Sequence, residues 1–164
     1  MNNYERLSVD LKSYVQRTRK GPCFICELVA GNPDFKHHVV YEDNSAIAFL
    51  DKFPTIAGHV LVAPKQHFEH VIIDFSIEKY LDFQKLIYRI GNAMHHAINT
   101  ERMYIYTLGS KDGNSHVHWH LAPLPPGVPY EKQQFEALMM ENGVLNISDE
   151  EMAALALKIR QEII

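Results

Sequence analysis

The amino-acid sequence predicts an α+β fold: about five mostly antiparallel strands in one sheet, a long helix between strands, and extra helices at the N- and C-terminal ends. Short apolar runs lie between residues 38 and 65 and again between residues 103 and 122. Polar turns bound these runs, as they bound strands. One long segment with helical periodicity, residues 76–99, separates the two groups. We therefore expect that this helix covers one side of the sheet.

The length of 164 residues lies within the usual range for one domain and is enough to bury a substantial core. We therefore expect a single domain over residues 1–164. Its core should lie at about 23–123, with an N-terminal helix at 4–19 and a C-terminal helical extension at 124–164.

The N-terminal helix is predicted by apolar residues at spacings of three and four, namely Leu7, Leu11, Tyr14 and Val15. Gly21-Pro22 should end this helix, and a short helical turn should follow as far as about Gly31. Residues 1–20 contain no apolar stretch fit to be a signal-peptide core or a membrane span. We expect a cytoplasmic protein without a membrane partner.

The sheet is predicted from five β-like runs, at residues 38–41, 46–50, 59–63, 103–107 and 116–122. Ser76 is a favourable N-cap for the long helix. The apolar face of that helix is predicted to consist of Tyr80, Phe83, Leu86, Ile87, Ile90 and Met94.

The C-terminal extension begins in a proline-rich segment, because residues 123–129 hold four of the eight prolines. Proline cannot continue the hydrogen bonding of a central strand, so the last strand must end there. We expect a helix from about 130 to 142 that stops at Gly143. A final helix should begin at Ser148, which can form a capping box with Glu151.

The composition is that of an ordinary globular protein, with 46% hydrophobic and 22% charged residues. The formal net charge of -4 gives no general attraction to nucleic acid polymers or to anionic membranes. If the chain binds phosphate, a local site must provide the binding.

A run of alternating histidines, His116-Val117-His118-Trp119-His120, is the strongest functional signal. In a strand, alternate side chains share a face, so the three imidazoles should lie together, roughly 7 Å apart between neighbours. Three readings remain open from the residues alone. The imidazoles carry out catalysis, they ligate one catalytic zinc together, or they lie on a solvated strand face.

The run resembles the signature of the histidine-triad (HIT) family, His-φ-His-φ-His-φ-φ with φ hydrophobic, here residues 116–122. The resemblance extends upstream to Val40-Tyr41-Glu42-Asp43, to Ala48-Phe49-Leu50-Asp51 and to the block from Gly58 to His67. These blocks occur in the order and spacing of the family and cover about residues 23–123. The resemblance implies a HIT-like fold, a small-molecule nucleotide substrate and a homodimer joined through the long helix and a neighbouring strand.

The resemblance also implies roles for single residues. His118 would be the nucleophile that attacks the α-phosphorus, with a backbone carbonyl holding its other ring nitrogen, and His120 would contact the phosphate oxygens. Asp51 would bind the ribose hydroxyls. The remaining candidates for contact with the nucleotide are Asn114 and Ser115 at the phosphate, and Leu28 and Phe49 at the base. Many family members have Gln four residues before the first histidine, where this chain has Asp112, so the turn that holds the leaving group is altered.

The two cysteines, Cys23 and Cys26, form a Cys-x-x-Cys pair that is typical of a metal or redox role in a cytoplasmic chain. In the zinc-containing branches of the superfamily, and in the related galactose-1-phosphate uridylyltransferases, the third ligand follows a Pro-Lys-x-His-like turn. The fourth is the first histidine of the catalytic strand. The resemblance thus implies a structural zinc held by Cys23, Cys26, His67 and His116.

Other readings of the thiols are a redox pair or two inert buried cysteines. Three further histidines lie near enough in the sequence to be alternative ligands, namely His37, His38 and His70. His59, His95 and His96 show no special signal.

We therefore expect a hydrolase or nucleotidyltransferase that acts on a nucleoside phosphoramidate, a dinucleoside polyphosphate or a related nucleotide. The alternatives are a zinc-stabilised nucleotide-binding module without turnover, and a zinc hydrolase that uses the triad as ligands.

Overall fold

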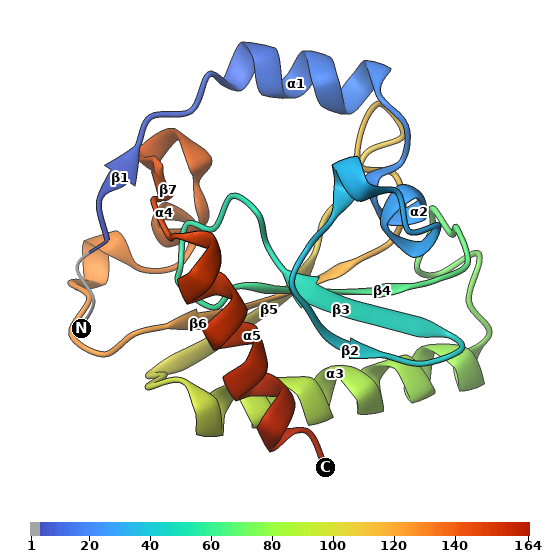
Figure 1. The fold of residues 1–164 in the computed structure, drawn as a ribbon. Coiled ribbons are helices and arrows are strands. Elements are labelled where there is room, and N and C mark those ends of the chain that lie inside the picture. Colours follow the sequence, from blue (N-terminus) through green and yellow to red (C-terminus); the bar gives the residue numbers. More distant parts are fainter. Residues whose placement is uncertain (1–3) are drawn as a thin grey trace.

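A computed structural model of the chain describes residues 4–164 and contains a five-stranded sheet in the order β2-β3-β4-β6-β5 (Figure 1). All neighbouring strands are antiparallel. Their bounds are Val39–Glu42 (β2), Ala46–Leu50 (β3), Val60–Pro64 (β4), Arg102–Thr107 (β5) and Trp119–Leu124 (β6). The predicted α+β fold is confirmed, and each predicted strand is present within about three residues of its expected start.

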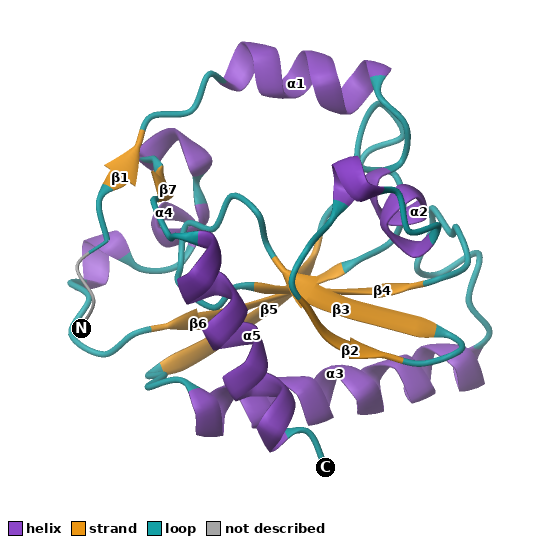
Figure 2. Cartoon of the chain, in the orientation of Figure 1, coloured by secondary structure: helices purple, strands orange, loops and turns teal. Residues whose placement is uncertain are grey.

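The long helix α3, Ile77–Ala97, lies along one face of the sheet, and α1 and α2 lie on the opposite side (Figure 2). Ser76 caps α3 through a hydrogen bond from the backbone N–H of Lys79, as the sequence predicts. Trp119 and Leu121 point toward α3 and belong to the main apolar core. Because side chains alternate along β6, the intervening His120 points to the other face.

The sixth strand begins three residues later than predicted, at Trp119. His116 lies at a bend, and Val117 and His118 lead from it into the strand. The backbone N–H of Val117 donates to the carbonyl of Phe68 at 2.7 Å. This contact comes from the segment after β4, which therefore runs beside the first two histidines of the triad.

The N-terminal prediction is wrong in its first half, because the helix α1 spans Leu11–Lys20 instead of residues 4–19. Arg6–Leu7 forms a short strand, β1, that pairs with β7, Val144–Leu145. Arg6 also donates hydrogen bonds to the carbonyls of Gly143 and Thr55. Asp10 then caps α1, since its carboxylate accepts from the backbone N–H of Ser13.

A second short helix, α2 (Phe24–Val29), and a 3₁₀ turn, η1 (Pro33–Phe35), connect α1 to the sheet. Cys23 is the N-cap of α2, and Ile25 on this helix is fully buried against β3 and β4. The predicted helical turn after Gly21-Pro22 is therefore confirmed.

The helix predicted at 130–142 is also wrong. The segment consists of η2 (Tyr130–Lys132), α4 (Phe135–Leu138) and η3 (Met140–Asn142). Gln134 has a φ of 55°, a left-handed conformation that interrupts an α-helix. The final helix α5, Asp149–Glu162, begins at Ser148 with the predicted capping box to Glu151 and packs against α3 and β2. Among the residues that the structure describes, no helix is both long and apolar enough to cross a membrane.

Candidate active site and metal centre

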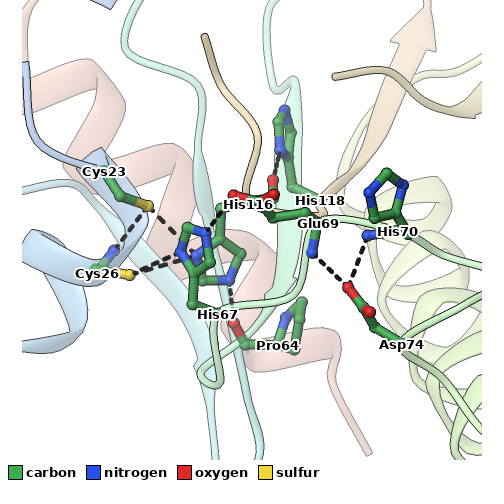
Figure 3. Close-up of polar contacts among 9 residues, drawn as sticks. All are labelled: Cys23, Cys26, Pro64, His67, Glu69, His70, Asp74, His116 and His118. Carbon is green, nitrogen blue, oxygen red and sulfur yellow. Dashed lines mark hydrogen bonds and ion pairs between the residues drawn. The ribbon is translucent and has the colours of Figure 1, made fainter. Parts of the chain in front are cut away.

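Four predicted metal ligands come together from three places in the chain (Figure 3). Cys23 and Cys26 lie on the first turn of α2, His67 follows β4, and His116 precedes β6. The Sγ atom of Cys26 lies 3.2 Å from His67 Nδ1 and 3.5 Å from His116 Nδ1. Cys23 Sγ lies 3.4 Å from the same His116 atom. All four donor atoms lie within 4.8 Å of one another.

These separations fit a tetrahedral zinc ion. With Zn–S bonds of about 2.3 Å and Zn–N bonds of about 2.0 Å, the ligand atoms of a tetrahedral site lie about 3.3 to 3.8 Å apart. The cluster therefore has the donor set of a Cys₂His₂ site, and three of its six donor separations are close to the tetrahedral values.

Both histidines of this cluster present the same nitrogen to the thiols. His116 Nε2 lies 2.8 Å from the carbonyl oxygen of Pro64, and His67 Nε2 lies 3.3 Å from Glu69 Oε1. Each Nε2–H donates outward, which leaves the Nδ1 lone pair facing the cysteines, as outer partners of zinc-bound histidines commonly require. Burial lowers the pKa of His116 to about 4, so its ring is neutral at pH 7, the form that ligates a metal.

The thiols need a cation more than the imidazoles do. Burial, together with the neighbouring Cys23, raises the pKa of Cys26 to about 11, so in the metal-free protein this thiol is protonated at pH 7. A bound divalent ion would supply the charge that stabilises both thiolates.

The turn after β4 is fixed by Asp74. Its carboxylate accepts from the backbone N–H groups of Glu69 and His70, at 2.8 and 2.9 Å (Figure 3). Glu69 in turn contacts His67 and the hydroxyl of Ser115, and these contacts lower the pKa of its carboxyl. Ser115, predicted at the phosphate, therefore lies beside Glu69, the hydrogen-bond partner of the predicted metal ligand His67.

His118 is buried, with 4% of its surface exposed, and its tautomer is set by the backbone. Nδ1 lies 2.6 Å from the carbonyl oxygen of His116, to which it donates (Figure 3). The hydrogen bond that the resemblance implies is present, and it leaves Nε2 with a free lone pair. Burial lowers the pKa of His118 against the opposing effect of that carbonyl, so the ring is neutral at pH 7.

Next to His118 lies a row of three polar side chains, Asp51, His59 and His120. His59 Nε2 is 3.0 Å from His120 Nδ1, and His59 Nδ1 is 3.3 Å from Asp51 Oδ2. The other carboxylate oxygen of Asp51 accepts from the backbone N–H of Phe53. The rings of His118 and His120 are 4.9 Å apart between centroids. Asp51 is thus connected to the triad through His59, a residue that no sequence pattern indicated.

Burial dominates the electrostatics of this row. It lowers the pKa of His59, and together with the two neighbouring imidazoles it lowers the pKa of His120 to about 2. Tyr106 stacks on His120 with ring centroids 4.5 Å apart and an interplanar angle of 7°, which fixes the plane of the imidazole. In the free protein the pocket therefore holds neutral rings and one carboxylate. The pocket favours binding of an anion over binding of a cation only after one of the rings takes up a proton.

The histidines of the triad belong to two separate groups of side chains in the structure. His116 turns its ring to the cysteines, whereas His120 groups with Asp51 and His59. Among residues 4–164, no metal-competent group contains all three triad histidines. The arrangement therefore disfavours a zinc hydrolase with the triad as its ligand set.

Other predicted nucleotide contacts are placed less favourably. Phe49 is fully buried in an apolar cluster of the core, and Leu28 packs against that cluster. Phe24 lies between Phe49 and the site, with its ring edge-on to both Phe49 and His118 at centroid distances of 6.2 and 6.1 Å. Asn114 has a φ of 53° and points Nδ2 toward the hydroxyl of Tyr14 at 3.5 Å. Phe24 and Tyr14 are site neighbours that no sequence motif indicated.

The alternative ligands expected near the cysteines lie elsewhere. His37 Nδ1 is 2.7 Å from the carbonyl oxygen of Phe35, and His38 pairs with Asp149 on α5 at 2.8 Å. His70 contributes its backbone N–H to Asp74 but is not in the metal-competent group. His95 and His96 lie in the last turn of α3.

Comparison with known proteins gives consistent matches. Residues 32–126 match the HIT domain family. The uncharacterized HIT-like protein of Saccharolobus solfataricus is 32% identical over 105 residues, which is 62% of this chain and 73% of the relative. Protein hit of Bacillus subtilis is 34% identical over 106 residues, 63% of this chain and 70% of the relative.

Solved structures give the same result. The hypothetical histidine triad nucleotide-binding protein of Sulfolobus tokodaii aligns with a TM-score of 0.68 and 25% identity, over 86% of this chain and 91% of that one. A zinc-bound histidine triad family protein of Mycobacterium smegmatis, 22% identical, aligns with a TM-score of 0.68 over 86% of this chain and 92% of that one, and shows the same fold. With a family match over more than half of its residues, this chain belongs to the HIT domain family.

Proposed function

We propose that this HIT protein is a hydrolase or nucleotidyltransferase that attacks the α-phosphorus of a nucleotide through His118 and forms a covalent nucleotidyl-histidine. The observation that carries the proposal is the hydrogen bond from His118 Nδ1 to the carbonyl of His116, because it leaves Nε2 as a neutral nucleophile in a buried site.

In the first step the Nε2 lone pair forms a bond to the α-phosphorus while the bond from phosphorus to the leaving group breaks. The leaving group departs with that electron pair and takes up a proton. In the second step water, or another acceptor hydroxyl, attacks the phosphorus and loses its proton. The P–N bond breaks, the nucleotide leaves, and His118 returns to its neutral form.

His59 and His120 would supply positive charge when it is needed. Both rings are neutral in the free protein because burial lowers their pKa values. An arriving phosphate adds negative charge and would raise these pKa values, so that the pair takes up a proton. A His59 cation held by Asp51 would donate to His120 Nδ1, and His120 Nε2–H would then donate to the phosphate. The second carboxylate oxygen of Asp51 accepts from a backbone N–H, and we propose that Asp51 also accepts hydrogen bonds from the ribose hydroxyls.

We further propose that Cys23, Cys26, His67 and His116 hold a structural zinc ion. The convergence of four zinc-ligand donors within 4.8 Å of one another and the outward hydrogen bonds of both imidazoles support this. The positive charge of the ion would stabilise the two thiolates. Its bonds would also join α2 to the segment before β6 that carries His116 and His118. Free thiols that bind zinc need a reducing compartment, which favours the cytoplasm.

A homodimer is the oligomeric state that we propose. Leu81 and Tyr88 on α3 are 50% and 73% exposed, and Gln84 between them has a buried side-chain nitrogen without a hydrogen-bond partner. The neighbouring strand β5 is an edge of the sheet and carries Ile105, which is 50% exposed. A second copy could cover this face. Light scattering should give twice the chain mass for the natural protein and a monomer for Tyr88→Glu, whereas Leu157→Glu on α5 should stay dimeric.

The rival function is a binding module without turnover. It is tested by measuring nucleotide affinity and turnover separately for the natural chain and for His118→Ala, with an adenosine phosphoramidate and a dinucleoside polyphosphate. We expect that the variant binds nucleotide within about tenfold of the natural affinity but loses turnover by a factor of about 10³ or more. Binding without turnover by the natural chain would favour the module.

A further inference from the structure

The helix α1 bridges the two loops that border the candidate active site. Its Tyr14 ring meets Phe53 edge-on at 6.2 Å, and the Tyr14 hydroxyl is 3.5 Å from Asn114 Nδ2. Phe53 is bonded through its backbone to Asp51, and Asn114 lies four residues before His118. Figure 1 shows α1 on the side of the sheet opposite α3, the side to which His120 points.

The contact with the second loop continues along the helix. A Cβ atom built on Gly113 would lie 3.0 Å from Thr18 Cγ2 and 3.6 Å from Arg19 Cγ. The turn of residues 110–115 therefore packs directly under the C-terminal half of α1. This turn immediately precedes the triad. The first carbons of the Arg19 side chain therefore lie beside the segment that leads to His118.

Helix α1 contributes little to the buried core of the protein. None of its residues is buried, and Val15 is 47% exposed. A helix that contributes so little to the core does not owe its position to core packing. It is joined to the rest of the chain at Gly21-Pro22, directly before the cysteine ligands.

The charge of α1 is strongly one-sided. It contains four cations and no acid, whereas the whole chain has a net charge of -4. Within the described residues none of these cations forms an ion pair with a carboxylate. The cations are Lys12, Arg17, Arg19 and Lys20.

Helix stability explains only part of this pattern. Cations in the last turn interact favourably with the helix dipole, which accounts for Arg17, Arg19 and Lys20. Lys12 lies in the first turn, where a cation is unfavourable, and the acidic N-cap Asp10 precedes that turn. Arg17 also interacts electrostatically with Asp10, whereas Arg19 and Lys20 form no ion pair within the described residues. The C-terminal half of α1 therefore presents positive charge, which is what a site for an anion requires.

We propose that α1 binds the phosphate groups beyond the α-phosphate of a nucleotide at His118, chiefly through Arg17 and Arg19. The two arginines flank the face of the helix that carries Tyr14 and Thr18, and guanidinium groups form paired hydrogen bonds to phosphate oxygens. This proposal rests on the proposed function and deepens it. The preferred substrates are those with an anionic polyphosphate leaving group, rather than those that release a neutral amine.

The test is the ratio of kcat/KM for diadenosine tetraphosphate to kcat/KM for adenosine 5′-phosphoramidate. In Arg17→Gln/Arg19→Gln we expect this ratio to fall about tenfold or more, since two charge-assisted contacts to phosphate are lost. Arg17→Lys/Arg19→Lys should keep much of the preference. The matched control is Lys158→Gln/Arg160→Gln near the end of α5, which removes the same charge from the helix that packs on α3 and β2.

Salt supplies a second readout. The ratio for the natural chain should fall between 50 and 300 mM NaCl, because exposed charge interactions are screened, and the fall should be smaller in Arg17→Gln/Arg19→Gln. A ratio that stays within twofold of the natural value in that variant would overturn the role of α1 while leaving the proposed function intact. An equal loss in the control variant would overturn it as well. If the natural chain turns over neither substrate, the proposed function itself fails, and this proposal with it.

Discussion

His116 and His118 are connected through the backbone: the carbonyl oxygen of His116 accepts the Nδ1 proton of His118 at 2.6 Å, while the His116 ring faces Cys23 and Cys26. One residue therefore belongs to the proposed metal centre through its side chain and sets the tautomer of the proposed nucleophile through its main chain. Anything that moves His116 should disturb both sites.

The metal centre gives the first prediction. Cys26→Ser should lower the zinc content to near zero, lower the melting temperature and reduce turnover, because the loss of one ligand opens the closed site and frees His116. Elemental analysis, thermal unfolding and steady-state kinetics measure the three effects. His70→Gln, on the same turn but outside the ligand group, is the control. Full zinc content in Cys26→Ser would contradict this assignment.

A second prediction concerns His59. His59→Gln should lower kcat by a factor of about 10² with a smaller change in KM. The reason is that glutamine cannot carry the proton that His59 would hold between Asp51 and His120. The exposed His95 on α3 provides the control His95→Gln. A kcat for His59→Gln equal to that of the control would show that His59 only fills space.

The stacking of Tyr106 on His120 predicts a difference between two substitutions. Tyr106→Phe keeps the ring and should keep kcat within about threefold, whereas Tyr106→Ala frees the imidazole and should lower both kcat and stability. The free energy of unfolding should fall by about 1 to 3 kcal/mol in the alanine variant. Urea unfolding and kinetics on both variants provide the check. Equal effects would mean that the phenolic hydroxyl, rather than the stacked ring, carries the role.

Buried histidines predict an acid-sensitive fold. Burial lowers the pKa values of His37, His59 and His120, the last to about 2. Below the unfolded pKa of about 6.5 the unfolded chain binds more protons than the folded one, so stability is full above that pH and falls as pH decreases. Each such histidine costs up to about 1.4 kcal/mol per pH unit. Urea midpoints between pH 7.5 and 5.0 should decrease, and more gradually in His59→Gln. A constant midpoint would contradict the buried, neutral state.

Local patterns predicted most of the sheet and the longest helix. Helical periodicity and Ser76 located α3, and short apolar runs bounded by turns located the strands. The N-terminal error has a non-local cause. Leu7 fits the apolar spacing of α1, but it pairs with Val144 in β1 and β7, a partner that no local pattern identifies.

The candidate site was predictable where the family motif fixes it and not where pairing does. The predicted metal ligands come from Cys-x-x-Cys and two motif histidines, and the structure brings all four together. His59 was missed because its position depends on the register between β4 and β6. Leu61 pairs with His120, so the side chain two residues earlier, on the same face, reaches that ring diagonally.

The central claim is that His118 becomes covalently bound to the nucleotide. The most direct test is the mass of the intact protein after rapid quenching, without acid, during turnover of an adenosine phosphoramidate or a dinucleoside polyphosphate. We expect an added adenylyl group in the natural chain and none in His118→Ala. An adduct that persists in His118→Ala, or turnover by the natural chain with no adduct at any quench time, would contradict covalent catalysis at His118.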